Sequence, residues 1–279
     1  MMVLEPAAAR SGEPLFETSD GPAPLVVSMP HSGTYLPPDL AARLAPAARD
    51  LPDTDWHVPR LYEFCESLGA SVLRATHSRY VVDLNRPPDG APLYPGKRET
   101  AVCPVETFDG DPLYAPADAP ARAEVDARIR RYWQPYHERI EALIRSKLER
   151  HRRCLLWDAH SIRSTVPALF DGRLPDLNVG TAGGHSCDPG TARLIVDRLA
   201  AQRRFTHVLD GRFKGGYITR RYGRPEAGVE AVQLEIAQSA YLREARRPDF
   251  DVAVAAPLIA LLRELLAALL DARSGAGAP

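Results

Sequence analysis

The feature that most constrains the fold of this chain is a short apolar run that leads directly into polar residues. Residues 155–157 read Leu-Leu-Trp, and Asp158, Ala159 and His160 follow at once. A second apolar run, at residues 25–29, leads to His31 in the same way. Such runs are typical of buried strands that deliver polar side chains to one edge of a sheet. Together they predict one site that is assembled by folding.

Strand-like and helix-like segments alternate along the rest of the chain. Strands are predicted at residues 25–29, 71–75, 80–84, 154–157, 178–181, 206–209 and 231–236, and helices at 39–48, 58–68, 119–152, 191–202 and 257–270. Pro135 is expected to kink or split the longest helix. The alternation predicts a single α/β domain over residues 1–279, with a mostly parallel sheet, helices on both faces and a loose lead-in at residues 1–20.

Three segments without clear periodicity are expected to be loops. Residues 91–116 are rich in Pro, Gly and Tyr and are expected to form an extended excursion that covers a site. Residues 170–189 are also irregular, and residues 214–223 form a basic stretch that contains several glycines. Long ordered loops of this kind commonly surround a functional site.

The overall composition argues against several classes of protein. Lys and Arg number 35 against 36 Asp and Glu, so no basic excess indicates nucleic-acid binding. Cys65, Cys103, Cys154 and Cys187 form no CxxC pair, and we expect free, mostly buried thiols in a cytoplasmic protein. The apolar stretch at residues 252–270 contains a proline and charged residues, so we expect a packed helix and not a membrane span.

The two histidines that follow the apolar runs suggest a metal site. Neutral imidazole nitrogens and a carboxylate are common zinc ligands, with one position left open for water. The positions three and four residues after His31 hold Thr34 and Tyr35, so the carboxylate must come from elsewhere. We therefore predict that His31 and His160 bind one divalent metal ion together with a more distant acidic residue.

The acidic turn at residues 50–55 supplies the candidates for that third ligand. Asp55 is our choice, and Asp53 is assigned a supporting position; the alternative is that both residues only cap the following helix. Asp158 lies two residues before His160, and residues two apart in a strand share a face. Asp158 is therefore expected to orient the metal site from behind its ligands.

Glu235 is the candidate catalytic residue. It lies in the predicted strand at residues 231–236, where a carboxylate is costly unless it is paired or functional. A general base that activates water beside a metal would explain its position. The alternative is a buried ion pair with an arginine.

Several arginines are candidates for binding a carboxylate substrate. Arg86 follows Asn85 at the end of a predicted strand, and a guanidinium beside an amide can bind a carboxylate through two hydrogen bonds. Arg220 and Arg221, in the basic stretch at residues 214–223, are candidates for binding a second carboxylate. Their alternative role is that of a solvated basic loop.

Five short motifs, taken in order, resemble those of the N-formylglutamate amidohydrolase family. They are Pro-His-Ser-Gly at residues 30–33, Asp-Thr-Asp-Trp at 53–56, Ser-Arg-Tyr-Val-Val-Asp-Leu-Asn-Arg at 78–86, Asp-Ala-His-Ser at 158–161 and Gln-Leu-Glu at 233–235. Each motif is weak alone, whereas the ordered set is specific. The resemblance extends from about residue 25 to residue 242, which is most of the chain.

The resemblance implies a fold, a cofactor and a reaction. The fold is a three-layer α/β/α sandwich similar to that of zinc carboxypeptidases and of aspartoacylase and succinylglutamate desuccinylase. The reaction is hydrolysis of N-formyl-L-glutamate to formate and L-glutamate, a final step of histidine degradation, with one zinc ion. His31 and His160 match the zinc histidines, Glu235 the base, and Asn85 with Arg86 the group that binds the substrate's α-carboxylate. The wider superfamily places its ligand glutamate where Thr34 stands here, so Asp53 or Asp55 must replace it.

Two other functions remain open at this point. A zinc amidase that acts on another acidic N-acyl amino acid would use the same residues. A protein that binds a metal or an amino acid without turnover would have little use for a buried base such as Glu235. A zinc exopeptidase is disfavoured, because the proline-rich loops are better suited to closing over a small molecule.

Overall fold

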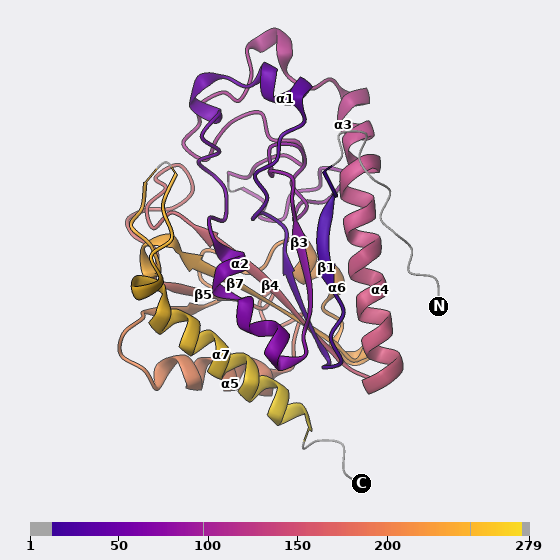
Figure 1. The fold of residues 1–279 in the computed structure, drawn as a ribbon, viewed down its shortest axis with the longest axis vertical. Coiled ribbons are helices and arrows are strands. Elements are labelled where there is room, and N and C mark those ends of the chain that lie inside the picture. The colour runs from indigo at the N-terminus through magenta and orange to yellow at the C-terminus, as the bar shows by residue number, and fades with distance from the viewer. Residues whose placement is uncertain (1–12, 97, 246, 275–279) are drawn as a thin grey trace.

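The computed structural model describes residues 13–96, 98–245 and 247–274, and these form a sheet with helices on both faces (Figure 1). The seven strands are ordered β1-β3-β2-β4-β7-β5-β6. Their bounds are Phe16–Ser19 (β1), Leu25–Met29 (β2), Ser71–Ala75 (β3), Cys154–Ile162 (β4), Leu177–Gly180 (β5), His207–Leu209 (β6) and Val229–Ala237 (β7). Only the β1–β3 and β5–β7 pairs are antiparallel, so the predicted mostly parallel α/β fold is confirmed.

The helices divide between the two faces of this sheet, and each group covers its own apolar cluster. The α-helices are Pro38–Arg43 (α1), Val58–Leu61 (α2), Arg122–Arg128 (α3), Gln134–His151 (α4), Pro189–Ala200 (α5), Tyr217–Tyr222 (α6) and Val252–Ser274 (α7). On one face, α4 and α6 pack on the even-numbered side chains of β4, such as Leu156. On the other face, α2, α5 and α7 pack on Leu155 and Trp157 (Figure 1). This alternation is what a strand buried on both faces requires.

Helix α7 is the one described helix that is long and apolar enough, by length and composition, to cross a membrane. We expected Pro257, Arg263 and Glu264 to leave no apolar stretch long enough to cross a membrane, and by length and composition that expectation is wrong. The structure nevertheless packs α7 against the sheet, where Leu258, Leu262, Leu265, Leu266 and Leu269 are buried. The expected packed C-terminal helix is confirmed, as are four free and buried cysteines.

The long helical segment predicted at residues 119–152 is interrupted by a turn of π-helix. The π turn covers Ile129–Trp133 and joins α3 directly to α4. Pro135 lies at the start of α4, immediately after this wider turn. Because proline has no N–H to donate, the π turn provides a place where the missing hydrogen bond is tolerated. The predicted effect of Pro135 is thus a local change in helix type.

Three predictions about regular structure were wrong. Residues 80–84 are not a strand: their side chains are buried, but Val81 N donates to Ser78 O over 2.9 Å in a turn. Residues 217–222 of the predicted basic loop form α6. The start of the lead-in, residues 1–12, lies outside the described residues, whereas Phe16–Ser19 forms the edge strand β1. The apolar side chains of residues 80–84 predict a strand, but the structure buries them in turns. Strand β1 is formed by its antiparallel pairing with β3 at the edge of the sheet.

The central strand β4 is also longer than predicted. It continues through Asp158 and His160 to Ile162, paired residue by residue with the parallel strand β7. In this register Asp158 lies beside Gln233, and His160 beside Glu235. Paired residues of neighbouring strands point to the same face. The sheet itself therefore places two acidic groups, an amide and an imidazole side by side.

Candidate metal centre and active site

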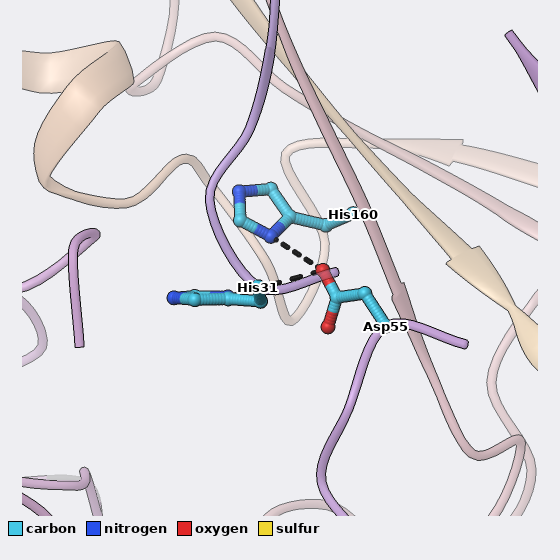
Figure 2. A group of neighbouring side chains, drawn as sticks. All are labelled: His31, Asp55 and His160. Carbon is cyan, nitrogen blue, oxygen red and sulfur yellow. Dashed lines mark hydrogen bonds and ion pairs between the residues drawn. The ribbon is translucent and has the colours of Figure 1, made fainter. Parts of the chain in front are cut away.

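Three buried side chains meet near the carboxyl ends of strands β2 and β4. His31 follows β2, His160 lies in β4, and Asp55 lies in the turn before α2. Their ligand atoms all lie within 4.8 Å of one another. Figure 2 shows both rings directed at the same Asp55 oxygen: Oδ2 lies 3.0 Å from His160 Nδ1 and 3.8 Å from His31 Nδ1. The backbone helps to hold this geometry, because Asp55 N donates to His31 O over 3.1 Å.

The outer nitrogen of each ring is held by a second buried carboxylate. His31 Nε2 lies 2.7 Å from Asp83 Oδ1, and His160 Nε2 lies 3.2 Å from Asp158 Oδ2. An acidic partner on one ring nitrogen fixes the ring and directs the lone pair of the other nitrogen toward a metal. Two such pairs that face a shared carboxylate are a donor set suited to zinc.

The protonation of the two rings differs because their surroundings differ. Burial lowers the pKa of His31, and the nearby Arg79 guanidinium acts in the same direction. Burial also disfavours a charged His160, but Asp158 and Asp55 together raise its pKa well above the usual value. A cation placed among these groups would compete with the proton on His160. Two carboxylates around one imidazole thus provide the negative charge that a divalent cation needs.

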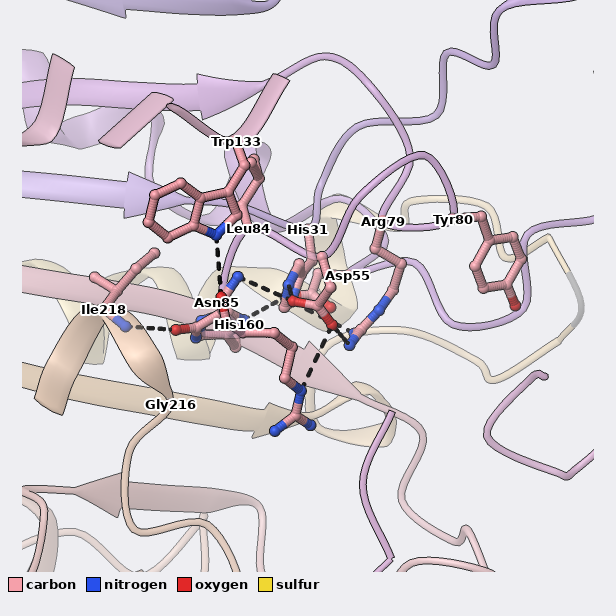
Figure 3. Close-up of polar contacts among 12 residues, drawn as sticks. His31, Asp55, Arg79, Tyr80, Leu84, Asn85, Trp133, His160, Gly216 and Ile218 are labelled. Carbon is pink, nitrogen blue, oxygen red and sulfur yellow. Dashed lines mark hydrogen bonds and ion pairs between the residues drawn. The ribbon is translucent and has the colours of Figure 1, made fainter. Parts of the chain in front are cut away.

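Asn85 connects the two halves of the site. Its Nδ2 donates to Asp158 Oδ2 over 3.0 Å. The same Nδ2 lies 2.9 Å from His160 Nε2, and the Oδ1 of Asn85 accepts from Ile218 N over 2.7 Å; Figure 3 shows these two contacts. The loop at Gly216 packs on this amide so closely that a Cβ there would lie 2.5 Å from Nδ2. Both polar ends of the amide are thus engaged, because Nδ2 contacts Asp158 and His160 while Oδ1 holds the backbone at Ile218. The close approach of the loop leaves room only for glycine at position 216.

Arg79 and Asp83 are site residues that the sequence reasoning did not select. Arg79 Nη2 donates to Asp83 Oδ2 over 2.6 Å, both side chains are buried, and Asp83 Oδ1 lies 2.7 Å from His31 Nε2. Burial opposes ionisation of Asp83, but His31 and Arg79 hold its pKa well below the usual range. A buried aspartate in an apolar run was the same signal that identified Glu235. In the motif at residues 78–86, however, roles were assigned only to Asn85 and Arg86.

Glu235 borders the same cavity as the three clustered residues. The cavity encloses about 640 Å³, part of it open to solvent, and its lining includes His31, Asp55, His160 and Glu235. Burial raises the pKa of Glu235 to about 8. Among the described residues, the side-chain hydrogen bond found for its carboxylate is the one donated by Gln233 Nε2 over 3.3 Å. The alternative of a close ion pair with arginine is not what the structure shows.

The structure places the remaining predicted residues as follows. Residues 91–96 and 98–116, here called the covering loop, contribute Tyr94, Thr100 and Phe108 to the cavity lining. Asp53 Oδ2 accepts from Tyr80 Oη and from Phe108 N, both over 2.8 Å, so it holds the covering loop and forms no hydrogen bond with either histidine. Arg86 lines the cavity and binds Glu99 over 2.8 Å. Arg220 and Arg221 are absent from the described lining of the cavity. Arg220 donates to Gly215 O, and Arg221 is half exposed and lies 3.9 Å from Glu141.

Comparisons with known proteins agree with these observations. The sequence model of a family described as N-formylglutamate amidohydrolase matches residues 23–242. A protein of Pseudomonas aeruginosa named N-formylglutamate deformylase is 53% identical over 251 residues, which cover 90% of this chain and 94% of the relative. A protein of the same name from Pseudomonas putida is 47% identical over 250 residues, which cover 90% and 93%.

Two solved structures have a similar fold. The crystal structure of N-formylglutamate amidohydrolase from Ralstonia eutropha JMP134 matches with a TM-score of 0.76 and 26% identity, over 93% of this chain and 97% of that one. The gene product Atu2144 from Agrobacterium tumefaciens matches with a TM-score of 0.67 and 19% identity, over 94% and 98%. The second match concerns the fold alone.

Proposed function

Because the chain belongs to the N-formylglutamate amidohydrolase family, and is thus a hydrolase, we propose that it hydrolyses N-formyl-L-glutamate to formate and L-glutamate with one bound zinc ion. The observation that carries this proposal is the meeting of His31, Asp55 and His160 at a cavity that Glu235 also lines. The reaction corresponds to the last step of histidine degradation, and we propose that it takes place in the cytoplasm.

The donor atoms fit a zinc ion. Atoms bound to one tetrahedral zinc lie roughly 3.3 Å apart, and Asp55 Oδ2 lies 3.0 Å and 3.8 Å from the two ring nitrogens. His31, Asp55 and His160 would hold the ion and leave the cavity side open. Bound there, zinc would supply Lewis acidity toward the formyl carbonyl and would promote the ionisation of water.

Glu235 is the general base in this proposal. Its side chain lies beside His160 in the paired strands, and its raised pKa makes it a better proton acceptor than an ordinary carboxylate. It takes a proton from the water that attacks the formyl carbon. As the bond between that carbon and the amide nitrogen breaks, Glu235 returns the proton to the nitrogen. The products are formate and the free amino group of glutamate.

Arg86 is proposed to bind the α-carboxylate of the substrate. Its Nε lies 3.9 Å from Asp83, the residue that holds His31, so its guanidinium is close to the reacting end of the cavity. Trp133 Nε1 donates to Arg86 O over 3.0 Å and fixes its backbone. Asn85, which we predicted to share this carboxylate, is assigned instead to positioning His160, because its amide is already engaged.

Formate release provides the test. We expect the purified protein to release formate from N-formyl-L-glutamate, to lose that activity when the metal is chelated, and to regain it when zinc is added. Full activity of metal-free protein would contradict the role of zinc. Parallel assays with N-acetyl- and N-succinyl-L-glutamate separate deformylation from the activity of an amidase with another acyl group; faster hydrolysis of either would overturn the substrate assignment.

A further inference from the structure

We infer that Arg212 binds the side-chain carboxylate of the substrate and thereby makes the enzyme specific for an acidic amino acid. The inference deepens the proposed function and rests on it. Arg212 lines the cavity but belongs to none of the sequence motifs described above. It lies in the loop between β6 and α6, close to the two arginines that the sequence had suggested for this task.

Arg212 differs from the other cavity arginines in its lack of a carboxylate partner. Four arginines line the cavity. Arg79 is bound to Asp83, Arg86 to Glu99 at 2.8 Å and Arg98 to Glu106 at 2.7 Å. Within the described part of the chain, no acidic side chain forms an ion pair with Arg212. Arg212 is thus the cavity cation whose charge is left for a ligand.

The surroundings of Arg212 hold its side chain without neutralising it. Its Nε donates to Leu169 O over 2.8 Å, and its guanidinium carbon lies 5.5 Å and 5.2 Å from the ring centres of Tyr94 and Phe213. The side chain is half-buried, and burial lowers its pKa, whereas the charges of Glu99 and Glu235 act in the opposite direction without forming an ion pair with it. A partly desolvated cation that no carboxylate contacts directly is unfavourable, and an incoming carboxylate would relieve that cost.

The loop that carries Arg212 is fixed on both sides. Before it, Asp210 accepts a hydrogen bond from Thr181 N over 2.8 Å. After it, Lys214 N donates to Tyr94 Oη over 3.1 Å, and Tyr94 Oη donates to Gly215 O over 2.9 Å. The guanidinium is therefore held in place before the ligand arrives, which reduces the entropy lost on binding.

The position of Arg212 favours the side-chain carboxylate over the α-carboxylate. The α-carboxylate is attached to the carbon that carries the formyl-amide nitrogen, so it must lie near the metal ligands. Arg86 is placed there by its proximity to Asp83. Arg212 instead rests on a wall formed with Leu169 and Phe213, which belong to a separate apolar cluster. The carboxylate of a glutamate side chain, two carbons further out, is the group that would reach it.

The test compares substrates that differ only in the side-chain carboxylate. We expect Arg212→Gln to lower kcat/KM for N-formyl-L-glutamate by on the order of 100-fold. The value for N-formyl-L-glutamine should change less than threefold. Arg212→Lys should restore part of the loss, because the charge remains and the planar fork does not. An equal fall for both substrates, or no fall for either, would overturn the inference.

Arg221→Gln provides the matched control. Arg221 is half exposed, lies 3.9 Å from Glu141 and does not line the cavity, so both substrates should be hydrolysed as by the wild type. Calorimetric binding of L-glutamate and L-glutamine separates this inference from the proposed reaction, because it requires no turnover. A preference for glutamate that disappears in Arg212→Gln supports the inference. A preference that persists, or no preference in the wild type, contradicts it, whatever the formate assay shows.

Discussion

The two walls of the cavity are built in different ways. One wall is regular: His160 and Glu235 project from the paired strands β4 and β7, whose register places them side by side. The other is irregular: Arg79, Asp83 and Arg86 come from a buried segment between β3 and α3 that has no ladder pairing. The regular wall supplies a ligand and the base, whereas the irregular wall supplies the charges that orient them. The register of paired strands fixes the positions of side chains without further contacts. An irregular backbone can direct several charged side chains toward one point.

The largest effect is expected on the regular wall. Glu235→Gln removes the proposed base but keeps the shape of the side chain, and kcat should fall by roughly 10²- to 10⁴-fold. The zinc content of the purified protein should stay near that of the wild type. Glu230→Gln, on the same strand but away from the cavity, is the control and should retain full activity. Near-normal turnover by Glu235→Gln would show that the base lies elsewhere.

The next effect compares the two walls directly. Asp83→Asn acts on His31 from the irregular wall, and Asp158→Asn acts on His160 from the regular one. Each substitution removes the negative charge behind a metal ligand and should weaken zinc affinity by about 10- to 100-fold. Competition with a chelator measures this affinity. If only Asp158→Asn weakens binding, the irregular wall has no part in holding the metal.

A third effect concerns stability and its dependence on pH. The pKa of Glu235 is raised to about 8, so the folded metal-free protein retains a proton that the unfolded chain loses above its ordinary pKa of 4.5. This group therefore reduces stability as the pH rises from about 4.5 to 8. In metal-free protein, Glu235→Gln should raise the free energy of unfolding by about 3 kcal/mol at pH 7.

Thermal or urea unfolding at several pH values measures that gain. The difference between Glu235→Gln and the wild type should shrink toward zero as the pH falls to about 4.5, because Glu235 is then protonated in both states. A difference that is constant with pH would mean that packing and not ionisation distinguishes the two proteins.

The smallest effect is expected where the covering loop meets the Arg212 loop. Tyr94→Phe removes the hydroxyl that bonds Lys214 N and Gly215 O, at a cost of about 1 kcal/mol. We expect KM for N-formyl-L-glutamate to rise by roughly 2- to 5-fold, with kcat nearly unchanged. Tyr114→Phe, whose hydroxyl accepts from Arg128 outside the cavity, is the control. Equal KM values for the two variants would argue against a role of this contact in binding.

The sequence allowed the regular wall to be predicted better than the irregular one. His160 and Glu235 interrupt apolar runs, and polar residues in buried strands are conspicuous because they are costly there. The alternation of strand-like and helix-like segments predicted the mostly parallel sheet with helices on both faces, but not the order of its strands. The assignment of Asp55 over Asp53 to the metal remains a prediction. The structure supports that choice by placing Asp55 within reach of both rings.

The irregular wall escaped prediction for a physical reason. The burial of residues 80–84 resembles that of a strand, yet their N–H groups bond within turns and to Val102 O. Asp83 and Arg79 acquire their roles only when this turn meets the segment that follows β2. The sequence around Arg212 does not identify it as a binding residue. Its position at the cavity depends on contacts with Leu169 and Tyr94, which are distant in sequence. Tertiary contacts, and not periodicity, determine which arginine faces the cavity.

The π turn at Ile129–Trp133 has a consequence for how this family can vary in length. A π turn contains one residue more than an α-helical turn, so it behaves as a single-residue insertion absorbed inside a helix. Deleting one residue there would rotate everything before it by about 100° relative to α4. Arg128 would then turn away from the carbonyls of Tyr80 and Val81, to which its Nη1 donates. Insertions and deletions are therefore expected in the surface loops. The number of residues from α3 through the π turn to α4 is expected to stay constant.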